Sequence, residues 1–276
     1  MNPLSLSLLS IAQLFYALTF VLHLLLFSGK VVRGYRGALA CMRLGFLLNT
    51  FYFFTEAVGQ GTLLPVASVS QAMAFFAWSL AFVYLVLFIR IQTESFGLIL
   101  SPILLAFLAL ASWARAFSAY ELPESLNAYF TVHIVSAFFA YACFTISFTA
   151  GVLYLMQQRE LKRKNPGQVY YRLPSLEELE GLIYQPMIWG ALLLLVAVGV
   201  GFFWSKLAYG EFSFLDPKTV STLVTAALYL AVLFLHYVSS QRGKKVVVLS
   251  MVAFGMVLFS FLGTRFLEGS HNFLHS

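Results

Sequence analysis

The sequence predicts an all-α, polytopic integral membrane protein with about eight transmembrane helices. Of its 276 residues, 61% are hydrophobic and 10% are charged, whereas soluble domains contain about 45–50% apolar and 25% charged residues. The apolar residues gather in runs of the length that a spanning helix needs, about 20 residues. Polar connections separate the runs and leave no room for a soluble domain. We therefore expect residues 1–276 to form a single transmembrane domain.

Eight apolar runs define the expected helices. They are Leu4–Phe27, Ala38–Val58, Val69–Ile89, Phe96–Trp113, Thr131–Met156, Ile183–Trp204, Val220–Val238 and Val246–Gly263. Turn-forming or charged segments divide them. The first run is too long for the core of a signal peptide and has no basic leader or small-residue cleavage site. We therefore expect it to stay in the protein as the first helix.

The charges of the connections alternate in sign and predict the topology. Basic residues follow the first, third, fifth and seventh runs: Lys30, Arg33, Arg36, Arg90, Arg159, Lys162, Arg163, Lys164, Arg172, Arg242, Lys244 and Lys245. Acidic residues follow the fourth, sixth and eighth runs: Glu121, Glu124, Glu211, Asp216 and Glu268. Because Lys and Arg accumulate in cytoplasmic loops, both termini are predicted on the non-cytoplasmic side. The net charge of +6 is therefore explained by the basic residues of the predicted cytoplasmic loops. We expect the lipid bilayer as a partner, and no nucleic acid.

Two connections carry further signals. The cytoplasmic loop 157–182 starts basic and continues as LPSLEELE at 173–180, where Ser175 can cap a short interfacial helix whose first turn holds carboxylates. A structural role and partner docking are both open for this helix. The external loop 204–219 is rich in aromatic residues, as in an interfacial belt or an apolar platform for a flat ligand. Its Asp216-Pro217 step is also an ordinary helix start.

Four histidines fall at two predicted depths. His23 and His236 lie near the cytoplasmic ends of the first and seventh runs, whereas His133 opens the fifth run and His271 follows the eighth, both outside. An ionisable residue in or beside a spanning helix is costly and indicates function. Because imidazole is an axial ligand of haem iron, each pair is a candidate haem site. The alternative is that they are hydrogen-bonded packing residues. His275 is expected to be a solvated tail residue.

The external loop resembles that of the cytochrome c assembly proteins of the CcsA, CcmC and HemX type. Members carry a tryptophan-rich motif, WGxxWxWDPKE, between two helices, flanked by histidines that bind haem. The stretch here keeps part of the motif and an upstream tryptophan: Trp204, Gly210, Asp216, Pro217 and Lys218. It replaces the three motif tryptophans and the glutamate: Tyr209, Ser213, Leu215 and Thr219.

Other family patterns extend the resemblance over most of the chain. The segment LPxLExLxxLxY is similar to residues 173–184, and YLH is similar to Phe234-Leu235-His236. The family's external histidines resemble His133 and His271. The resemblance implies that His133 and His271 are external axial ligands of haem b and that His236 is an inner haem histidine. His23 matches no family motif and is a candidate ligand from its depth alone.

The resemblance implies haem delivery in c-type cytochrome biogenesis. Haem accepted at inner-leaflet depth is then presented externally on a platform that includes Trp204, Tyr209 and Asp216. The implied partners are apocytochrome c and a CcsB-like membrane subunit that completes a holocytochrome c synthase in the cell inner (cytoplasmic) membrane. The thiols of the substrate form the bonds, so no catalytic residue is expected here, and whether the chain is an enzyme subunit is open.

Two other functions are alternatives to haem delivery. The lost loop tryptophans reduce the stacking area for haem, which favours a HemX-like membrane regulator of a haem-biosynthesis enzyme that acts through loop 157–182. A small-solute transporter typically has broken helices or inverted repeats. The sequence indicates neither feature.

Overall fold

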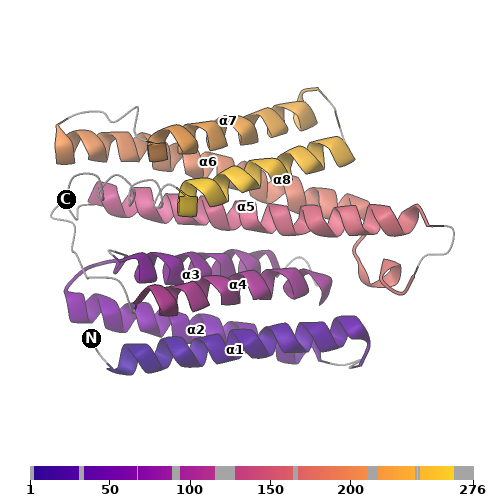
Figure 1. Cartoon of the computed structure of the whole chain (residues 1–276), viewed down its shortest axis with the longest axis horizontal. Coiled ribbons are helices and arrows are strands. Elements are labelled where there is room, and N and C mark those ends of the chain that lie inside the picture. Colours follow the sequence, from indigo (N-terminus) through magenta and orange to yellow (C-terminus); the bar gives the residue numbers. More distant parts are fainter. Residues whose placement is uncertain are drawn as a thin grey trace. The chain divides into compact units, whose positions relative to one another are not determined.

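The computed structural model describes residues 3–30, 34–66, 68–88, 94–115, 128–163, 167–210, 217–239, 241 and 243–263. Nearly all of these residues are helical, and none of them forms a strand (Figure 1). The long helices are α1 (Pro3–Ser28), α2 (Tyr35–Gln60), α3 (Val69–Phe88), α4 (Glu94–Arg115), α5 (Ala128–Leu161), α6 (Leu176–Tyr209), α7 (Pro217–Tyr237) and α8 (Lys244–Leu258). Two short elements complete them: the 3-10 turn η1 (Tyr170–Arg172) and the π-helical turn η2 (Phe259–Gly263).

Eight helices in the described part of the chain are long and apolar enough to cross a membrane. This result confirms the predicted polytopic all-α class, and each helix coincides with one apolar run. The side of the membrane on which the termini lie stays a prediction. α7 begins at Pro217, as expected of a proline at a first helical position.

The connection between α5 and α6 is shorter than the sequence suggested. Both helices have 34 residues, which corresponds to about 50 Å and exceeds a hydrocarbon core of about 30 Å. The expectation of a separate interfacial helix after Ser175 is wrong, because these residues form the first turns of α6 itself. Glu177 and Glu178 do lie in its first turn, where the helix dipole stabilises negatively charged carboxylates.

The chain divides into two compact units. The first unit comprises residues 1–126 and 156–176, and the second comprises 127–155 and 177–276. In the first unit α1 packs on α2 and α4, and α3 packs on α4 and α2. Gly45 of α2 allows this close packing, because a Cβ there would lie 3.0 Å from the buried ring of Tyr16.

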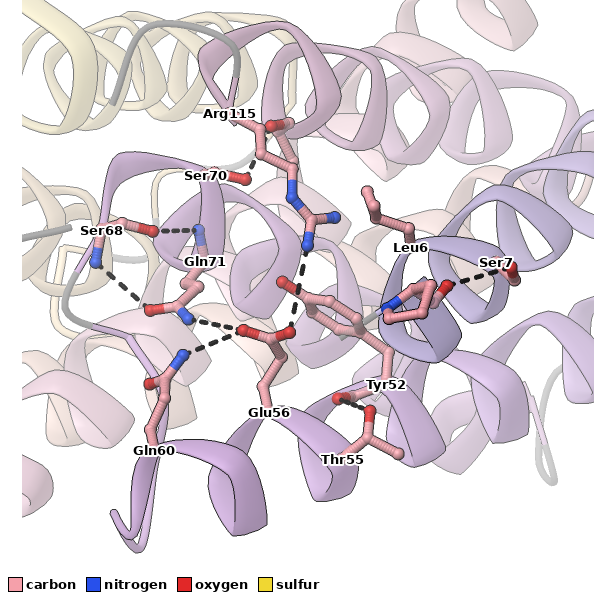
Figure 2. Close-up of polar contacts among 12 residues, drawn as sticks. Leu6, Ser7, Tyr52, Thr55, Glu56, Gln60, Ser68, Ser70, Gln71 and Arg115 are labelled. Carbon is pink, nitrogen blue, oxygen red and sulfur yellow. Dashed lines mark hydrogen bonds and ion pairs between the residues drawn. The ribbon is translucent and has the colours of Figure 1, made fainter. Parts of the chain in front are cut away.

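A buried polar network joins three helices of the first unit (Figure 2). The Glu56 carboxylate of α2 accepts hydrogen bonds from the side-chain amides of Gln60 (2.9 Å) and Gln71 (3.1 Å). Its other oxygen lies 3.9 Å from the Arg115 guanidinium at the end of α4. Gln71 and Ser68 also exchange hydrogen bonds in a capping box that starts α3. The Glu56 carboxylate of α2 therefore contacts side chains of both α3 and α4.

A residue of the α5–α6 connection caps α1. Arg172 of η1 donates from Nη1 to the carbonyls of Leu26 (2.9 Å) and Phe27 at the end of α1. Neither carbonyl has a partner within α1 itself, and the Leu26 carbonyl also accepts from the backbone N–H of Gly29 (3.0 Å). The chain then turns at Gly29, whose φ of 77° favours glycine. Part of the predicted cytoplasmic loop is thus fixed to the end of the first helix.

Aromatic stacks hold the second unit together. Phe144 of α5 stacks on Tyr229 of α7 with ring centroids 3.6 Å apart and an interplanar angle of 4°. Phe148 stacks on Phe254 of α8 at 4.5 Å. Gly190 brings α6 against the same core, because a Cβ there would lie 2.7 Å from the Phe144 ring. Such rings bury large apolar areas and favour defined pair geometries.

Candidate functional site

His133 lies on the second turn of α5, with its imidazole against α6. Its Nδ1 atom is 2.6 Å from the backbone carbonyl oxygen of Ala197. A carbonyl oxygen carries no proton, so Nδ1 is the donor in this hydrogen bond. Gly201, one turn further along α6, faces the same imidazole edge. The ring is half-buried and held by backbone groups of a neighbouring helix.

An aromatic pair lies one turn beyond His133. Phe130 of α5 and Trp204 of α6 have ring centroids 5.3 Å apart with a tilt of 51°. Phe130 is three residues from His133 on α5, and Trp204 is three residues from Gly201 on α6, so each lies on the helix face of the imidazole contact. The structure thus brings together His133 and Trp204, two of the residues predicted for the external site. The other three, Asp216, His271 and the side chain of Tyr209, lie outside the described residues.

His236 lies at the opposite end of the second unit, near the end of α7. Its ring stacks on Tyr184 of α6 with centroids 3.4 Å apart and an interplanar angle of 15°. The Tyr237 ring contacts its edge at 4.6 Å. The imidazole is half-buried, and Tyr184 covers one of its faces. The stack therefore fixes the orientation of the ring.

The distance between the levels of His133 and His236 can be measured along helix α6. Tyr184 marks the level of His236 and Gly201 marks that of His133 on this continuous helix. At a rise of about 1.5 Å per residue these two positions are about 25 Å apart. The hydrocarbon core of a bilayer is about 30 Å thick. His133 and His236 therefore lie near opposite ends of one unit, and their depths in the membrane stay a prediction.

His23 is placed differently from the other two. It belongs to α1 of the first unit and is only 1% exposed. A Cβ at Gly97 of α4 would overlap the Nε2 and Cε1 atoms of His23. The Tyr35 ring lies edge-on to the imidazole, with ring centroids 6.4 Å apart. The imidazole thus fills the space between neighbouring helices of its own unit, which is the arrangement of a packing residue.

The donor set of the second unit fits haem. His133 donates from Nδ1, so in the neutral ring Nε2 carries the lone pair that can bind iron. A hydrogen bond from the second ring nitrogen is the usual support of a ligating histidine. His236 is the second imidazole of this unit, and it lies beside the rings of Tyr184 and Tyr237. For His23, the backbone of α4 at Gly97 occupies the position next to Nε2.

The network of Glu56, Gln71 and Arg115 was not predicted from the sequence. A signal was present, since Glu56 is a carboxylate inside the second apolar run and such residues indicate a functional or structural polar site. The Ala197 carbonyl and Gly201 carried no comparable signal. Glycines are frequent in membrane helices, and a backbone carbonyl has no residue type.

Comparisons with known proteins identify the family of this chain. The sequence profile of the family described as "Cytochrome C assembly protein" matches residues 66–271. The chain is 29% identical over 224 residues to Protein HemX of Brevibacillus brevis, which covers 78% of this chain and 79% of that protein. It is 25% identical over 268 residues to Protein HemX of Bacillus subtilis (strain 168), with 94% and 93% covered. It is also 22% identical over 249 residues to Cytochrome c biogenesis protein CcsA of Porphyra purpurea, with 76% and 78% covered. His133, His236 and His271 lie within the matched region, and His23 lies before it.

Proposed function

Since this chain belongs to the cytochrome c assembly protein family, we propose that it is a multi-pass protein of the cell inner membrane that carries haem b as cargo. Haem is accepted at the level of His236 and held at the level of His133 on the external side. In c-type cytochrome biogenesis it is delivered from there to apocytochrome c, with a CcsB-like membrane subunit as partner. This chain supplies ligation and orientation, and the thiols of the substrate supply the bonds.

The observation that supports this proposal most directly is the pair of histidine levels in the second unit. His133 and His236 are half-buried at positions about 25 Å apart along α6, similar to the thickness of a hydrocarbon core. By the charge distribution of the loops, His236 is at the cytoplasmic level. His271 is assigned as the second external ligand from its family motif.

The first test is the visible spectrum of the protein purified from haem-replete cells. We expect a low-spin spectrum with two axial histidines. His133→Ala and His271→Ala should each weaken it at the external site, and His236→Ala should lower haem loading. Because His23 is packed against Gly97, His23→Ala should leave the spectrum unchanged if it still folds. A wild-type protein that carries no haem under any condition would overturn the proposal.

A second candidate function is a HemX-like membrane regulator of a haem-biosynthesis enzyme. The fixed α5–α6 connection favours it, because Arg172 anchors η1 to α1 while the neighbouring Tyr171 is 78% exposed. Exposed tyrosines on rigid segments are frequent anchors of protein interfaces. Deletion of the gene separates the two functions. Delivery predicts loss of covalent haem from c-type cytochromes, whereas regulation predicts altered levels of haem precursors with covalent attachment intact.

A further inference from the structure

We propose that α6 selects the tautomer of His133: the Ala197 carbonyl holds the proton on Nδ1, and Gly201 leaves the space in which this contact forms. Both are positioning groups, and neither touches iron. The inference rests on the proposed function in one respect, that Nε2 is the atom offered to haem. The tautomer itself is a property of the protein without haem.

The first step is the hydrogen bond. The contact between His133 Nδ1 and the Ala197 oxygen is 2.6 Å, at the short end for a nitrogen donor. Within α6 this oxygen also faces the backbone N–H of Gly201, the residue four positions later. A carbonyl oxygen has two lone pairs, so it can serve the helix and the imidazole together. The Nδ1–H tautomer is therefore stabilised at no cost to α6.

The second step is the space at Gly201. A Cβ on this residue would lie 2.6 Å from His133 Nδ1 and 2.8 Å from Cε1. Ring atoms so close to the backbone cannot yield as the end of a flexible side chain would. A methyl group would therefore push the imidazole away from α6 and from the Ala197 carbonyl. Glycine is required here by the close approach of two helices.

The same helix provides a matched control. Gly199 lies two residues earlier in α6, and a Cβ there would meet nothing within 4 Å. Replacement of either glycine by alanine adds one methyl group and raises helix propensity by a similar amount, about 1 kcal/mol. The two variants differ only in whether the methyl group meets His133.

The consequence concerns iron. With Nδ1 protonated, Nε2 is the basic nitrogen, and the hydrogen bond to a carbonyl raises its strength as a ligand. Loss of such an outer contact typically weakens metal binding about 10- to 100-fold. If Gly201→Ala releases the ring, the external haem should be held by a weaker or wrongly oriented imidazole. His133 remains chemically intact in this variant.

The deciding measurement uses haem-free protein labelled with ¹⁵N-histidine, at about pH 8 where imidazole is neutral. The signal of His133 is assigned by its loss in His133→Ala. We expect the Nδ1–H tautomer in the wild type and in Gly199→Ala, and a mixture or the Nε2–H tautomer in Gly201→Ala. An Nε2–H tautomer in the wild type, or no change in Gly201→Ala, would overturn the inference.

Haem titration adds the second readout. Gly201→Ala should bind haem about 10- to 100-fold more weakly than Gly199→Ala, with partial loss of the low-spin spectrum that added imidazole restores. Equal weakening in both variants would show a general effect of the methyl group and would contradict the inference. If the wild type binds no haem, the proposed function fails, and so does the role of Nε2, whatever the tautomer.

Discussion

The two units solve the placement of polar groups in a membrane in different ways. In the first unit Glu56, Gln71 and Arg115 contact one another inside the helix bundle (Figure 2). In the second unit large aromatic rings fill the core, and histidines lie half-buried at its two ends. The polar network joins helices inside the first unit, whereas the two histidines of the second unit are partly exposed. This difference supports the proposal that the second unit holds haem.

The two histidine environments express the same contrast. His23 of the first unit is buried against the backbone of α4, and His133 of the second is held at its Nδ1 edge by one carbonyl. The matched family region begins at residue 66 and leaves α1 and α2 out. Histidines predicted at similar depths can thus have different surroundings, because the neighbouring helices decide what each ring contacts.

The largest effect is expected for Glu56→Ala in the first unit. This change leaves Arg115 and two glutamines without their shared acceptor. Removal of one partner of a buried ion pair costs about 3–5 kcal/mol. Thermal unfolding of the purified protein in detergent should show a clear fall in Tm. Glu177→Ala, an exposed residue of α6, is the control. Equal stability of the two variants would contradict the role of the network.

Gly97→Ala should cost about 3 kcal/mol, the upper end for overpacking, because its methyl group overlaps the His23 ring. Gly37→Ala in α2 is the matched control, since a Cβ there meets nothing within 4 Å. Adding His23→Ala to Gly97→Ala should recover stability by removing the overlap. A double variant no more stable than Gly97→Ala alone would show that His23 does not fill this space.

Arg172→Ala should destabilise the first unit by about 2 kcal/mol, because hydrogen bonds from charged groups contribute about 1.5–3 kcal/mol. Both the Leu26 and the Phe27 carbonyl lose the Arg172 donor in this variant, and the Leu26 carbonyl keeps the backbone N–H of Gly29. Hydrogen exchange should show faster opening of the last turn of α1. Arg159→Ala, an exposed residue at the end of α5, is expected to change neither quantity. Unchanged hydrogen exchange in Arg172→Ala would show that η1 does not cap α1.

The smallest effect is expected for Tyr184→Leu in the second unit. Loss of the stack on His236 lowers the free energy of unfolding by about 1 kcal/mol, in addition to the effect of the buried apolar area that is lost. Tyr184→Phe keeps the ring and should match the wild type in Tm. Both measurements can be made by the same thermal unfolding assay. If leucine and phenylalanine behave alike, the ring stack contributes nothing to the position of His236.

The contacts between distant helices explain which expectations the sequence could support. Apolar runs and loop charges depend on neighbouring residues, and they predicted all eight helices, most bounds to within a few residues. The interfacial helix expected after Ser175 was wrong because local capping signals start a helix without showing how far it continues. His133, His236 and Trp204 were singled out by residue type and depth. That His23 belongs to the other compact unit was not predictable from depth.

The sequence by itself determined the class of the protein, its spanning segments and the family motifs, since each depends on residues close together in the chain. Only the tertiary structure decided what holds each histidine. Ala197 lies 64 residues from His133, and Leu26 lies 146 residues from Arg172. The acceptor in both cases is a backbone carbonyl, which every residue possesses. Which carbonyl meets which side chain is fixed by the packing of helices, because only the approach of two backbones brings the donor within hydrogen-bond distance.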